Sequence, residues 1–294
     1  MTAPRKRVLS GMQPSGLMHL GNYLGALENW KALQAEYDCY FFVADWHALS
    51  TNYADTTRIR TFVQDMLIDW LAGGINPERC TIFIQSRIPE HAILHLLLSM
   101  MTPVSWLERN PTYKEKQEEI KEKDLTTYGF LGYPVLQAAD ILLYKPDFVP
   151  VGKDQLPHLE LTRELARRFN DIYKTAVFPE PKEHLTKFPK VLGTDGRKMS
   201  KSYHNTINLS DAEPVVRQKL KTMVTDPARV RRTDPGNPDI CPVYEFHKIY
   251  SPQPVQDQIN KDCRTAAIGC IDCKKLVADR VVEQLTPVWD ARAK

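Results

Sequence analysis

The feature that most constrains the fold is a repeated change from strand-like to helix-like patterns through the first half of the chain. Short apolar runs alternate with longer stretches whose apolar residues recur every three to four positions. The strand-like runs cover residues 8–12, 40–44, 81–85 and 148–151, and the helix patterns that follow them end near residues 37, 71, 100 and 169. This alternation predicts an α/β fold with a Rossmann-like, doubly wound parallel sheet.

The pattern becomes mainly helical after about residue 205. We therefore predict two domains: a Rossmann-like domain at 1–205 and a smaller, mainly helical C-terminal domain at 206–294. The net charge of +3 is too small to indicate nucleic-acid binding by itself. One basic cluster in the second domain fits either an RNA contact or a solvated surface: Arg217, Lys219, Lys221, Arg229, Arg231 and Arg232.

The chain is expected to be a cytoplasmic globular protein. It has no apolar run long enough to span a membrane, and the apolar stretch after Arg5, Lys6 and Arg7 is too short for a secretory signal. Membrane partners are therefore not expected.

A basic, hydroxyl-rich run, KMSKS, occupies residues 198–202 and follows the glycine-broken stretch Gly193 to Gly196. Flexible ammonium groups and hydroxyls can follow the oxygens of a polyphosphate as charge moves among them. Two lysines alone more often form a solvated turn. The run gains weight from a second element far upstream.

That second element is the stretch from Pro14 to Asn22, which follows a strand-like run and opens a helix pattern. A strand, a glycine-containing turn and a helix start can bring backbone N–H groups to a phosphate. His19 and Asn22 would add directional donors. A glycine turn before a helix is common, so this stretch alone is weak, but with KMSKS it predicts an ATP site.

One helix pattern carries polar residues on an apolar face. Tyr133, Gln137 and Asp140 fall at i, i+4 and i+7 among alanine, isoleucine and leucine. A buried carboxylate needs hydrogen-bond donors. Asp140 therefore either binds a ligand donor, such as an aromatic N–H or O–H, or pairs with an arginine or lysine.

Five segments together resemble the bacterial-type tryptophanyl-tRNA synthetases, which are class I enzymes. They read GMQPSGLMHLGNYLGAL, ADWHALST, YPVLQAADILLY, VPVGKDQLPHLELTRELARRFN and GTDGRKMSKS, between about residues 9 and 205. HLGN, at residues 19–22, resembles the HIGH element of the class. The resemblance implies ATP-dependent activation of L-tryptophan, with release of pyrophosphate, and its transfer to tRNA(Trp). It also implies that 1–205 is the catalytic domain and 206–294 the anticodon-binding region.

The resemblance also assigns residues to roles. Asp140 would accept the indole N–H, and Gln137 stands where some members have methionine. The phosphate-handling residues would be His19, Lys114, Lys198 and Lys201. The full ATP set would be Gly11, Gln13, Ser15, His19, Gly21, Asn22, Gly152, Asp154, Lys198, Met199, Ser200 and Lys201. The tryptophan set would be Gln13, Tyr133, Gln137, Asp140, Val149, Val151 and Gln155.

The chemistry needs no protein nucleophile, because the tryptophan carboxylate itself attacks the α-phosphorus of ATP. Mg²⁺ would arrive coordinated mainly by ATP, since no acidic cage for it is evident. Two other functions remain open at this point. The pocket residues could bind tyrosine in a tyrosine–tRNA ligase, and the chain could be a catalytically silent RNA-binding paralogue.

Six cysteines fall into two groups. Cys39 and Cys80 accompany strand patterns and are expected to be buried small hydrophobic residues. Cys241, Cys263, Cys270 and Cys273 form C-x21-C-x6-C-x2-C, which can supply four thiolates to a [4Fe–4S] cluster or to Zn²⁺, unless they are free thiols. The spacing resembles the iron–sulfur-bearing subgroup of the family, which favours [4Fe–4S]. The resemblance also implies a homodimer.

Overall fold

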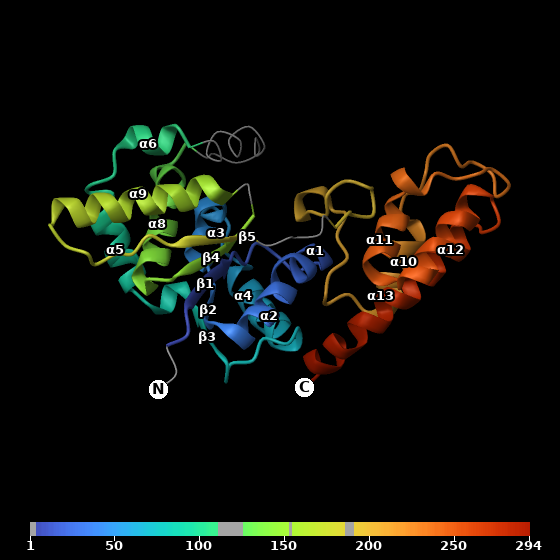
Figure 1. Cartoon of the computed structure of the whole chain (residues 1–294), viewed down its shortest axis with the longest axis horizontal. Helices are drawn as coiled ribbons and strands as arrows, with labels where there is room; N and C mark the ends of the chain where they lie inside the picture. The colour runs from blue at the N-terminus through green and yellow to red at the C-terminus, as the bar shows by residue number, and fades with distance from the viewer. Residues whose placement is uncertain (1–3, 111–125, 153–154, 186–190) are drawn as a thin grey trace. The chain divides into compact units, whose positions relative to one another are not determined.

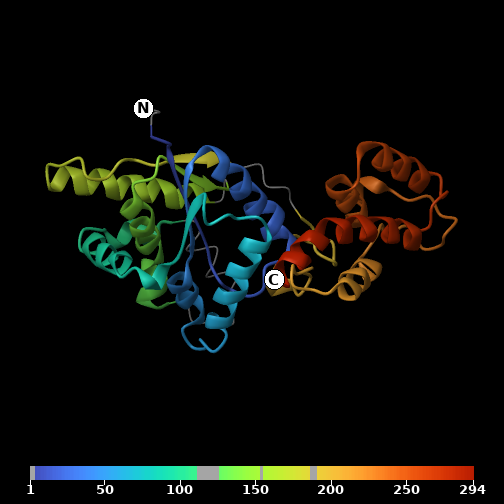
Figure 2. The ribbon, with the colours of Figure 1, turned by 90° about the horizontal axis from the view of Figure 1, so that it is seen from below.

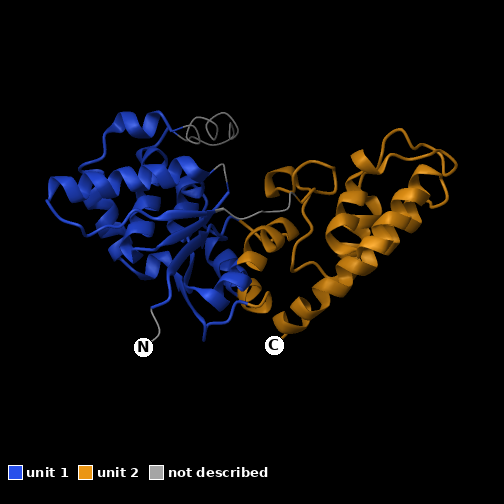
Figure 3. Ribbon diagram, viewed as in Figure 1, with its two compact units in different colours: residues 1–15, 30–67, 75–187 blue, residues 16–29, 68–74, 188–294 orange. Residues whose placement is uncertain are grey.

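The computed structural model describes residues 4–110, 126–152, 155–185 and 191–294. The chain forms two compact units, neither of which is a single stretch of sequence (Figure 3). Unit 1 contains Met1–Ser15, Trp30–Leu67 and Ile75–Lys187, and unit 2 contains Gly16–Asn29, Ile68–Gly74 and Phe188–Lys294. The division into domains near residue 205 stays a prediction.

A five-stranded parallel sheet forms the centre of unit 1 (Figure 1). The strands are β1 (Arg7–Met12), β2 (Asp38–Val43), β3 (Cys80–Ile84), β4 (Phe148–Val151) and β5 (Lys182–Leu185). Their order is β3-β2-β1-β4-β5, which reverses direction at β1, as in a doubly wound fold. The register pairs Leu9 with Tyr40 and Gly11 with Phe42. The predicted fold class is confirmed, and the edge strand β5 is the strand that the apolar pattern misses.

Helices cover both faces of this sheet (Figures 1 and 2). One face is covered by α5, α8 and α9, and the other by α2 and by the part of α4 that belongs to unit 1. The helical elements that precede residue 173 are α1 (Leu20–Asn22), a π-helical turn (Tyr23–Leu27), α2 (Glu28–Glu36), α3 (Asp45–Asn52), α4 (Ile59–Ala72), the 3₁₀ turn η2 (Gln85–Arg87), α5 (Glu90–Ser99), α6 (Val104–Glu108), α8 (Tyr128–Tyr144) and α9 (Leu156–Ile172).

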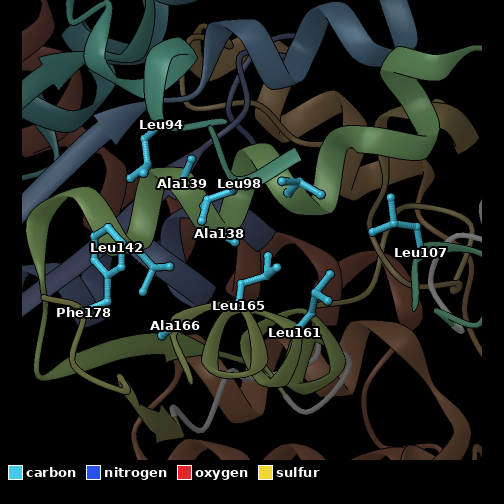
Figure 4. Close-up of a cluster of buried hydrophobic side chains, with 11 residues drawn as sticks. Leu94, Leu98, Leu107, Ala138, Ala139, Leu142, Leu161, Leu165, Ala166 and Phe178 are labelled. Carbon is cyan, nitrogen blue, oxygen red and sulfur yellow. The ribbon is translucent and has the colours of Figure 1, made fainter. Parts of the chain in front are cut away.

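An apolar cluster joins α5, α8 and α9 (Figure 4). Leu98 of α5, Leu142 of α8 and Leu165 of α9 are fully buried in it. Burying a leucine side chain contributes about 1.5–3 kcal/mol, so this cluster fixes α8 firmly against its neighbours. The helix that carries Tyr133, Gln137 and Asp140 is thus part of a rigid layer.

Unit 2 is mainly helical beyond residue 205, as predicted. Its later helical elements are a 3₁₀ turn (Lys201–Tyr203), α10 (Glu213–Thr222), a second 3₁₀ turn (Pro238–Ile240), α11 (Pro242–Tyr250), α12 (Gln253–Arg264) and α13 (Cys270–Arg292). Trp289 of α13 donates its indole N–H to the backbone carbonyl of Leu209 at 2.9 Å, and Arg292 pairs with the buried carboxylate of Asp69. These contacts fasten α13 within the unit.

Candidate active site

The two phosphate-binding motifs predicted from the sequence are in contact within unit 2. The Lys201 ammonium donates a hydrogen bond to the carbonyl oxygen of Gly16 at 3.0 Å. Gly16 has φ of +134°, and a Cβ there would come within 3.2 Å of the Lys201 side chain. A Cβ on Gly21 would lie 3.8 Å from that of Met199. Glycine at position 16 therefore lets the two segments approach each other, whereas the tight contact at Gly21 is with the His19 ring, which a Cβ would meet at 2.9 Å.

The KMSKS run begins at the end of a short hairpin formed by residues 191–199. Met199 N–H donates to the carbonyl of Val191 and Gly193 N–H to that of Arg197, at 2.9 and 2.7 Å. Gly196 makes the turn with φ of +81°, a conformation that favours glycine. The loop is thus built by its own backbone.

Asn205 braces the same loop from behind. Its amide donates to the Asp195 carboxylate at 2.7 Å and to the carbonyl of Lys198 at 3.2 Å. Its side-chain oxygen accepts the N–H of Ser200 at 2.8 Å. The position of Lys198 and Ser200 therefore depends on one buried amide that the sequence did not single out.

His19 caps the short helix α1. Its Nδ1 accepts the backbone N–H of Asn22 at 3.3 Å, while Asn22 Oδ1 accepts the N–H of His19 at 3.2 Å. Burial, and then the charge of Lys201, lower the pKa of His19 to about 4. The ring is therefore neutral near pH 7, with its proton on Nε2, and it can donate one hydrogen bond to a ligand.

The start of this helix differs from the prediction. We expected backbone N–H groups free to bind phosphate, but Leu20 N–H donates to the carbonyl of Ile207 and Asn22 N–H is taken by His19. A π-helical turn also follows α1 before α2 continues. Two of the backbone N–H groups at this helix start are therefore already used within the protein.

Lys201 loses part of its charge through burial. Desolvation lowers its pKa from the ordinary 10.5 to about 8. An anion beside it would restore the charge, because a nearby opposite charge favours the ammonium form.

Asp140 is the centre of a polar network in unit 1. It is 1% exposed on α8. His47 of α3 contacts its Oδ2 through Nε2 at 2.8 Å, and His91 of α5 contacts its Oδ1 through Nδ1 at 2.7 Å. Gln85 of η2 donates to both carboxylate oxygens at 2.8 and 2.9 Å.

Among the residues that the structure describes, the partners of Asp140 are two histidines and one glutamine, so the alternative of a salt bridge to an arginine or lysine finds no support there. Burial alone would raise the pKa of Asp140, but the hydrogen bonds from His47 and His91 outweigh it and lower the pKa below its ordinary value. The carboxylate stays ionised and remains an acceptor.

The other residues of the predicted tryptophan set lie on the elements around this network. Tyr133 is buried on α8, and its hydroxyl contacts Nε2 of His158 at 3.1 Å. Val149 and Val151 of β4 belong to a buried apolar cluster with Phe42 and Leu9. Of the remaining members, Gln137 is half-buried on α8, Gln155 is the N-cap residue of α9, and Gln13 follows β1.

Further predicted residues of unit 1 lie at the carboxyl ends of the strands. Gly11 is the penultimate residue of β1, and Gln13 and Ser15 follow the strand. Gly152 follows β4, and its carbonyl accepts the N–H of Gln155 at 3.0 Å. Ligands of open α/β sheets bind at this edge. Lys114 and Asp154 lie outside the described residues.

The basic cluster is largely used within unit 2. Arg217 pairs with Glu213 and Asp279, and Lys219 with Asp211. Arg229 is buried and donates to the carbonyls of Arg232 and Ile268. The RNA-contact interpretation therefore gains no support from these three side chains.

The cysteines also separate as predicted. Cys39 and Cys80 are buried neighbours on β2 and β3. Burial raises the pKa of Cys273 to about 12, with smaller contributions from the charges of Cys241, Cys263 and Cys270, so these four thiols lie near one another. In the described part of the chain, no group of three or more histidine, cysteine or acidic side chains is placed so that it could hold a metal ion. The four cysteines form no disulfide.

No helix among the described residues is long and apolar enough to cross a membrane.

Comparisons with known proteins agree with this geometry. The sequence profile of "tRNA synthetases class I (W and Y)" matches residues 2–286. The chain is 54% identical to a tryptophan–tRNA ligase of Thermotoga maritima, over 97% of this chain and 87% of that one. It is 46% identical to the tryptophan–tRNA ligase of Ralstonia nicotianae, over 98% and 90%.

The solved tryptophanyl-tRNA synthetase of Campylobacter jejuni, complexed with ADP and tryptophan, has a similar structure. Its TM-score is 0.88 at 32% identity, covering 98% of this chain and 88% of that one. A tyrosyl-tRNA synthetase of Archaeoglobus fulgidus, at 21% identity, shares the fold.

The chain belongs to the class I tRNA synthetases for tryptophan and tyrosine. The relatives that are 46% and 54% identical to it are tryptophan–tRNA ligases. The predictions of an ATP-dependent synthetase and of tryptophan as its amino acid are therefore confirmed.

The lowered pKa of Lys201 predicts an alkaline limit to activity. Because the ammonium form binds phosphate, kcat/KM for ATP should fall as pH rises through about 8 in tryptophan-dependent pyrophosphate exchange. Lys201→Arg, which stays charged, should shift this alkaline fall in kcat/KM to higher pH. The matched Lys198→Arg should leave it at the same pH. An unchanged limb in Lys201→Arg would contradict the assignment.

Proposed function

We propose that the residues above carry out tryptophan activation and transfer in a defined division of roles. The observation that carries this proposal is the contact between Lys201 and the Gly16 turn beside neutral His19, because it brings the KMSKS and HLGN segments together.

The ATP-binding role falls on two groups of residues. In unit 2, His19, Lys198 and Lys201 handle the phosphates, Asn22, Ser200 and Gly21 accompany them, and Met199 packs near the adenine. For Gly11, Gln13, Ser15 and Gly152, which belong to unit 1, the proposed role in ATP binding rests on the family resemblance. The proposed roles of Lys114 and Asp154 rest on the family resemblance alone.

The tryptophan-binding role falls on α8 and β4. Asp140 accepts the indole N–H, while Val149 and Val151 supply the apolar wall. Tyr133, Gln137, Gln155 and Gln13 bind the amino and carboxylate groups. The support for this assignment is that Asp140 stays ionised inside an apolar layer, where an N–H donor is worth more than it is in water.

The first chemical step is an in-line displacement. The tryptophan carboxylate forms a bond to the α-phosphorus of ATP, and the bond from that phosphorus to the pyrophosphate oxygen breaks. Lys198 and Lys201 stabilise the negative charge that develops on the departing pyrophosphate, and His19 Nε2–H donates to a phosphate oxygen. Mg²⁺ arrives with ATP and neutralises part of its charge.

In the second step, the terminal ribose hydroxyl of tRNA(Trp) displaces AMP from the adenylate. We also propose a cytoplasmic location for this reaction.

A charging assay with parallel substrates tests the function. The purified protein should attach tryptophan, and not tyrosine, to tRNA in the presence of ATP. Lys198→Ala should slow tryptophan-dependent pyrophosphate exchange by about 100-fold or more, since removal of one group that stabilises transition-state charge has that order of effect. Comparable charging with tyrosine would favour the sister enzyme, and no charging with either would favour a silent paralogue.

We also propose that the four clustered cysteines hold a [4Fe–4S] cluster. Each thiolate of such a cluster binds a different iron atom, so its four ligands need not surround a single ion. Cys263 is tightly enclosed, since a Cβ on Gly236 would come within 2.6 Å of its sulfur. The buried Arg229 guanidinium lies 3.7 Å from the same sulfur and supplies positive charge beside the thiolates.

Metal analysis checks this assignment. Protein purified without oxygen should be brown and contain about four iron atoms per chain. Cys270→Ala should lose the iron, while Cys39→Ala, at a buried cysteine of the sheet, should retain it. Colourless, iron-free protein would contradict the proposal, and about one zinc per chain would replace it with a four-thiolate zinc site.

We propose that the chain is a homodimer that pairs through α5. Ile93, Leu96, Leu97 and Met100 lie at i, i+3, i+4 and i+7 on one face of this helix, and all four are exposed. A contiguous apolar helix face on a soluble protein indicates a protein interface. A second copy of this chain is the partner that the family resemblance implies.

Light scattering on a gel-filtration column tests the dimer. The measured mass should be about twice the 33.8 kDa of the chain. Leu96→Glu should yield monomer, because a charge would be buried unpaired, whereas Ile172→Glu, at an exposed position on α9, should remain dimeric. A monomeric parent protein would exclude this interface.

A further inference from the structure

The buried carboxylate of Asp140 is held by side chains that have no part in the proposed chemistry. His91 and Gln85 are both fully buried. They come from α5 and η2, whereas Asp140 is on α8. Each makes a hydrogen bond of 2.7–2.9 Å to the carboxylate. Three separate elements thus meet at one functional group.

These contacts saturate the carboxylate. Oδ1 accepts from His91 and Gln85, and Oδ2 accepts from His47 and Gln85. A carboxylate has about four lone-pair sites, so a substrate N–H must share or replace one of these bonds. The partners that remain then determine how the carboxylate is oriented.

The three partners differ in how firmly they are held. Nε2 of His91 lies 2.8 Å from the Tyr144 hydroxyl, so both ring nitrogens are engaged. Gln85 uses its amide on Asp140 and its Oε1 on the backbone N–H of Trp46 at 3.1 Å. In the described part of the chain, the His47 ring makes one hydrogen bond, to Asp140. A substrate N–H would therefore replace the hydrogen bond from His47, and the hydrogen bonds from His91 and Gln85 would remain.

The direction of these bonds follows from the chemistry of the acceptor. An ionised carboxylate can only accept, so Nδ1 of His91 carries a proton and donates it. Nε2 of the same ring contacts the Tyr144 hydroxyl at 2.8 Å. Tyr144, His91 and Asp140 thus form a hydrogen-bonded series that ends on the carboxylate.

We propose that His91 and Gln85 are positioning residues that aim the Asp140 carboxylate at the ring N–H of the substrate and keep it an acceptor. This inference rests on the proposed function, in which Asp140 receives that N–H. The titratable groups that face Asp140 are His47 of α3, His91 and His95 of α5, and Tyr144 of α8. The hydrogen bond from His91 is one of the interactions that lower the pKa of Asp140, which agrees with this role.

Steady-state pyrophosphate exchange tests the proposal. His91→Leu should raise KM for tryptophan about ten- to hundredfold, the range typical for loss of a residue that orients a functional group. KM for ATP should stay within about twofold. His91→Asn, whose amide can replace the Nδ1–H donor, should recover most of the loss, and Gln85→Leu should behave like His91→Leu.

The dependence of KM on pH separates positioning from a purely structural role. Without the His91 donor, the pKa of Asp140 rises, so the acid limb of 1/KM for tryptophan should move to higher pH in His91→Leu. Leu98→Val, a destabilising change on the same helix α5, should lower Tm without moving this limb or KM. Tyr144→Phe should give a smaller increase in KM, because it removes only the hydroxyl beyond His91.

A folded His91→Leu protein with the parental KM for tryptophan and an unmoved acid limb would overturn the inference. The inference would also be overturned if Leu98→Val changed KM and the acid limb as much as His91→Leu does. It would likewise be overturned if His91→Asn recovered none of the loss seen in His91→Leu. Failure of the proposed function would look different, since the parent protein itself would then not exchange pyrophosphate in the presence of tryptophan. If His91→Leu does not fold, His91→Asn and Tyr144→Phe still test the inference. Each should raise KM for tryptophan by the smaller amount predicted above, and an unchanged KM in both would overturn it.

Discussion

The burial of one ionised carboxylate, Asp140, is the constraint on which the layer of helices α5, α8 and α9 depends. An unpaired carboxylate in an apolar layer costs several kcal/mol, so α8 can occupy its place only if donors from α3, η2 and α5 arrive with it. The apolar cluster of α5, α8 and α9 supplies the packing energy, but apolar contacts tolerate small slides. Hydrogen bonds of 2.7–2.9 Å do not, and they set the register of the helix layer.

The proposed phosphate-binding residues of unit 2 follow the opposite principle. Around Asp140 the protein satisfies a charge completely, whereas around Lys201 and His19 burial weakens charge: the pKa of each is lowered, to about 8 and about 4. A polyphosphate reverses this for Lys201, because its negative charge favours the ammonium. Since Asn205 and the hairpin already fix the loop backbone, little conformational entropy needs to be lost when ATP binds.

The parts of this structure that the sequence predicts are those with local causes. The alternation of apolar runs predicts the parallel sheet, and the spacing of Tyr133, Gln137 and Asp140 predicts one helix face, because both depend on neighbours in the chain. The partners of Asp140 could not be found in this way. His91, Gln85 and His47 lie 49, 55 and 93 residues away, and each looks like an ordinary polar residue of a helix or turn. Asn205 was missed for a related reason, since its role appears only when the hairpin of residues 191–199 has formed. The two compact units interleave in sequence, which no single change of composition along the chain could reveal.

Selection of tryptophan cannot come from Asp140 alone. An ionised carboxylate accepts an indole N–H or a phenol O–H equally well, so the hydrogen bond identifies a donor and not its ring. In the proposed tryptophan site, discrimination must then arise from shape, and the apolar cluster of β1, β2 and β4 would set that shape. A Cβ on Gly11 would come within 2.4 Å of the Phe42 ring, and Phe42 stacks on Phe83 with ring centroids 5.4 Å apart, which leaves that wall little freedom to move. A rigid wall and an aimed carboxylate act together: the wall fixes where a ring can lie, and His91 and Gln85 fix the point at which its donor must arrive. A ring of a different size then fails because its donor misses the acceptor, and the unmet hydrogen bond adds to the loss of packing.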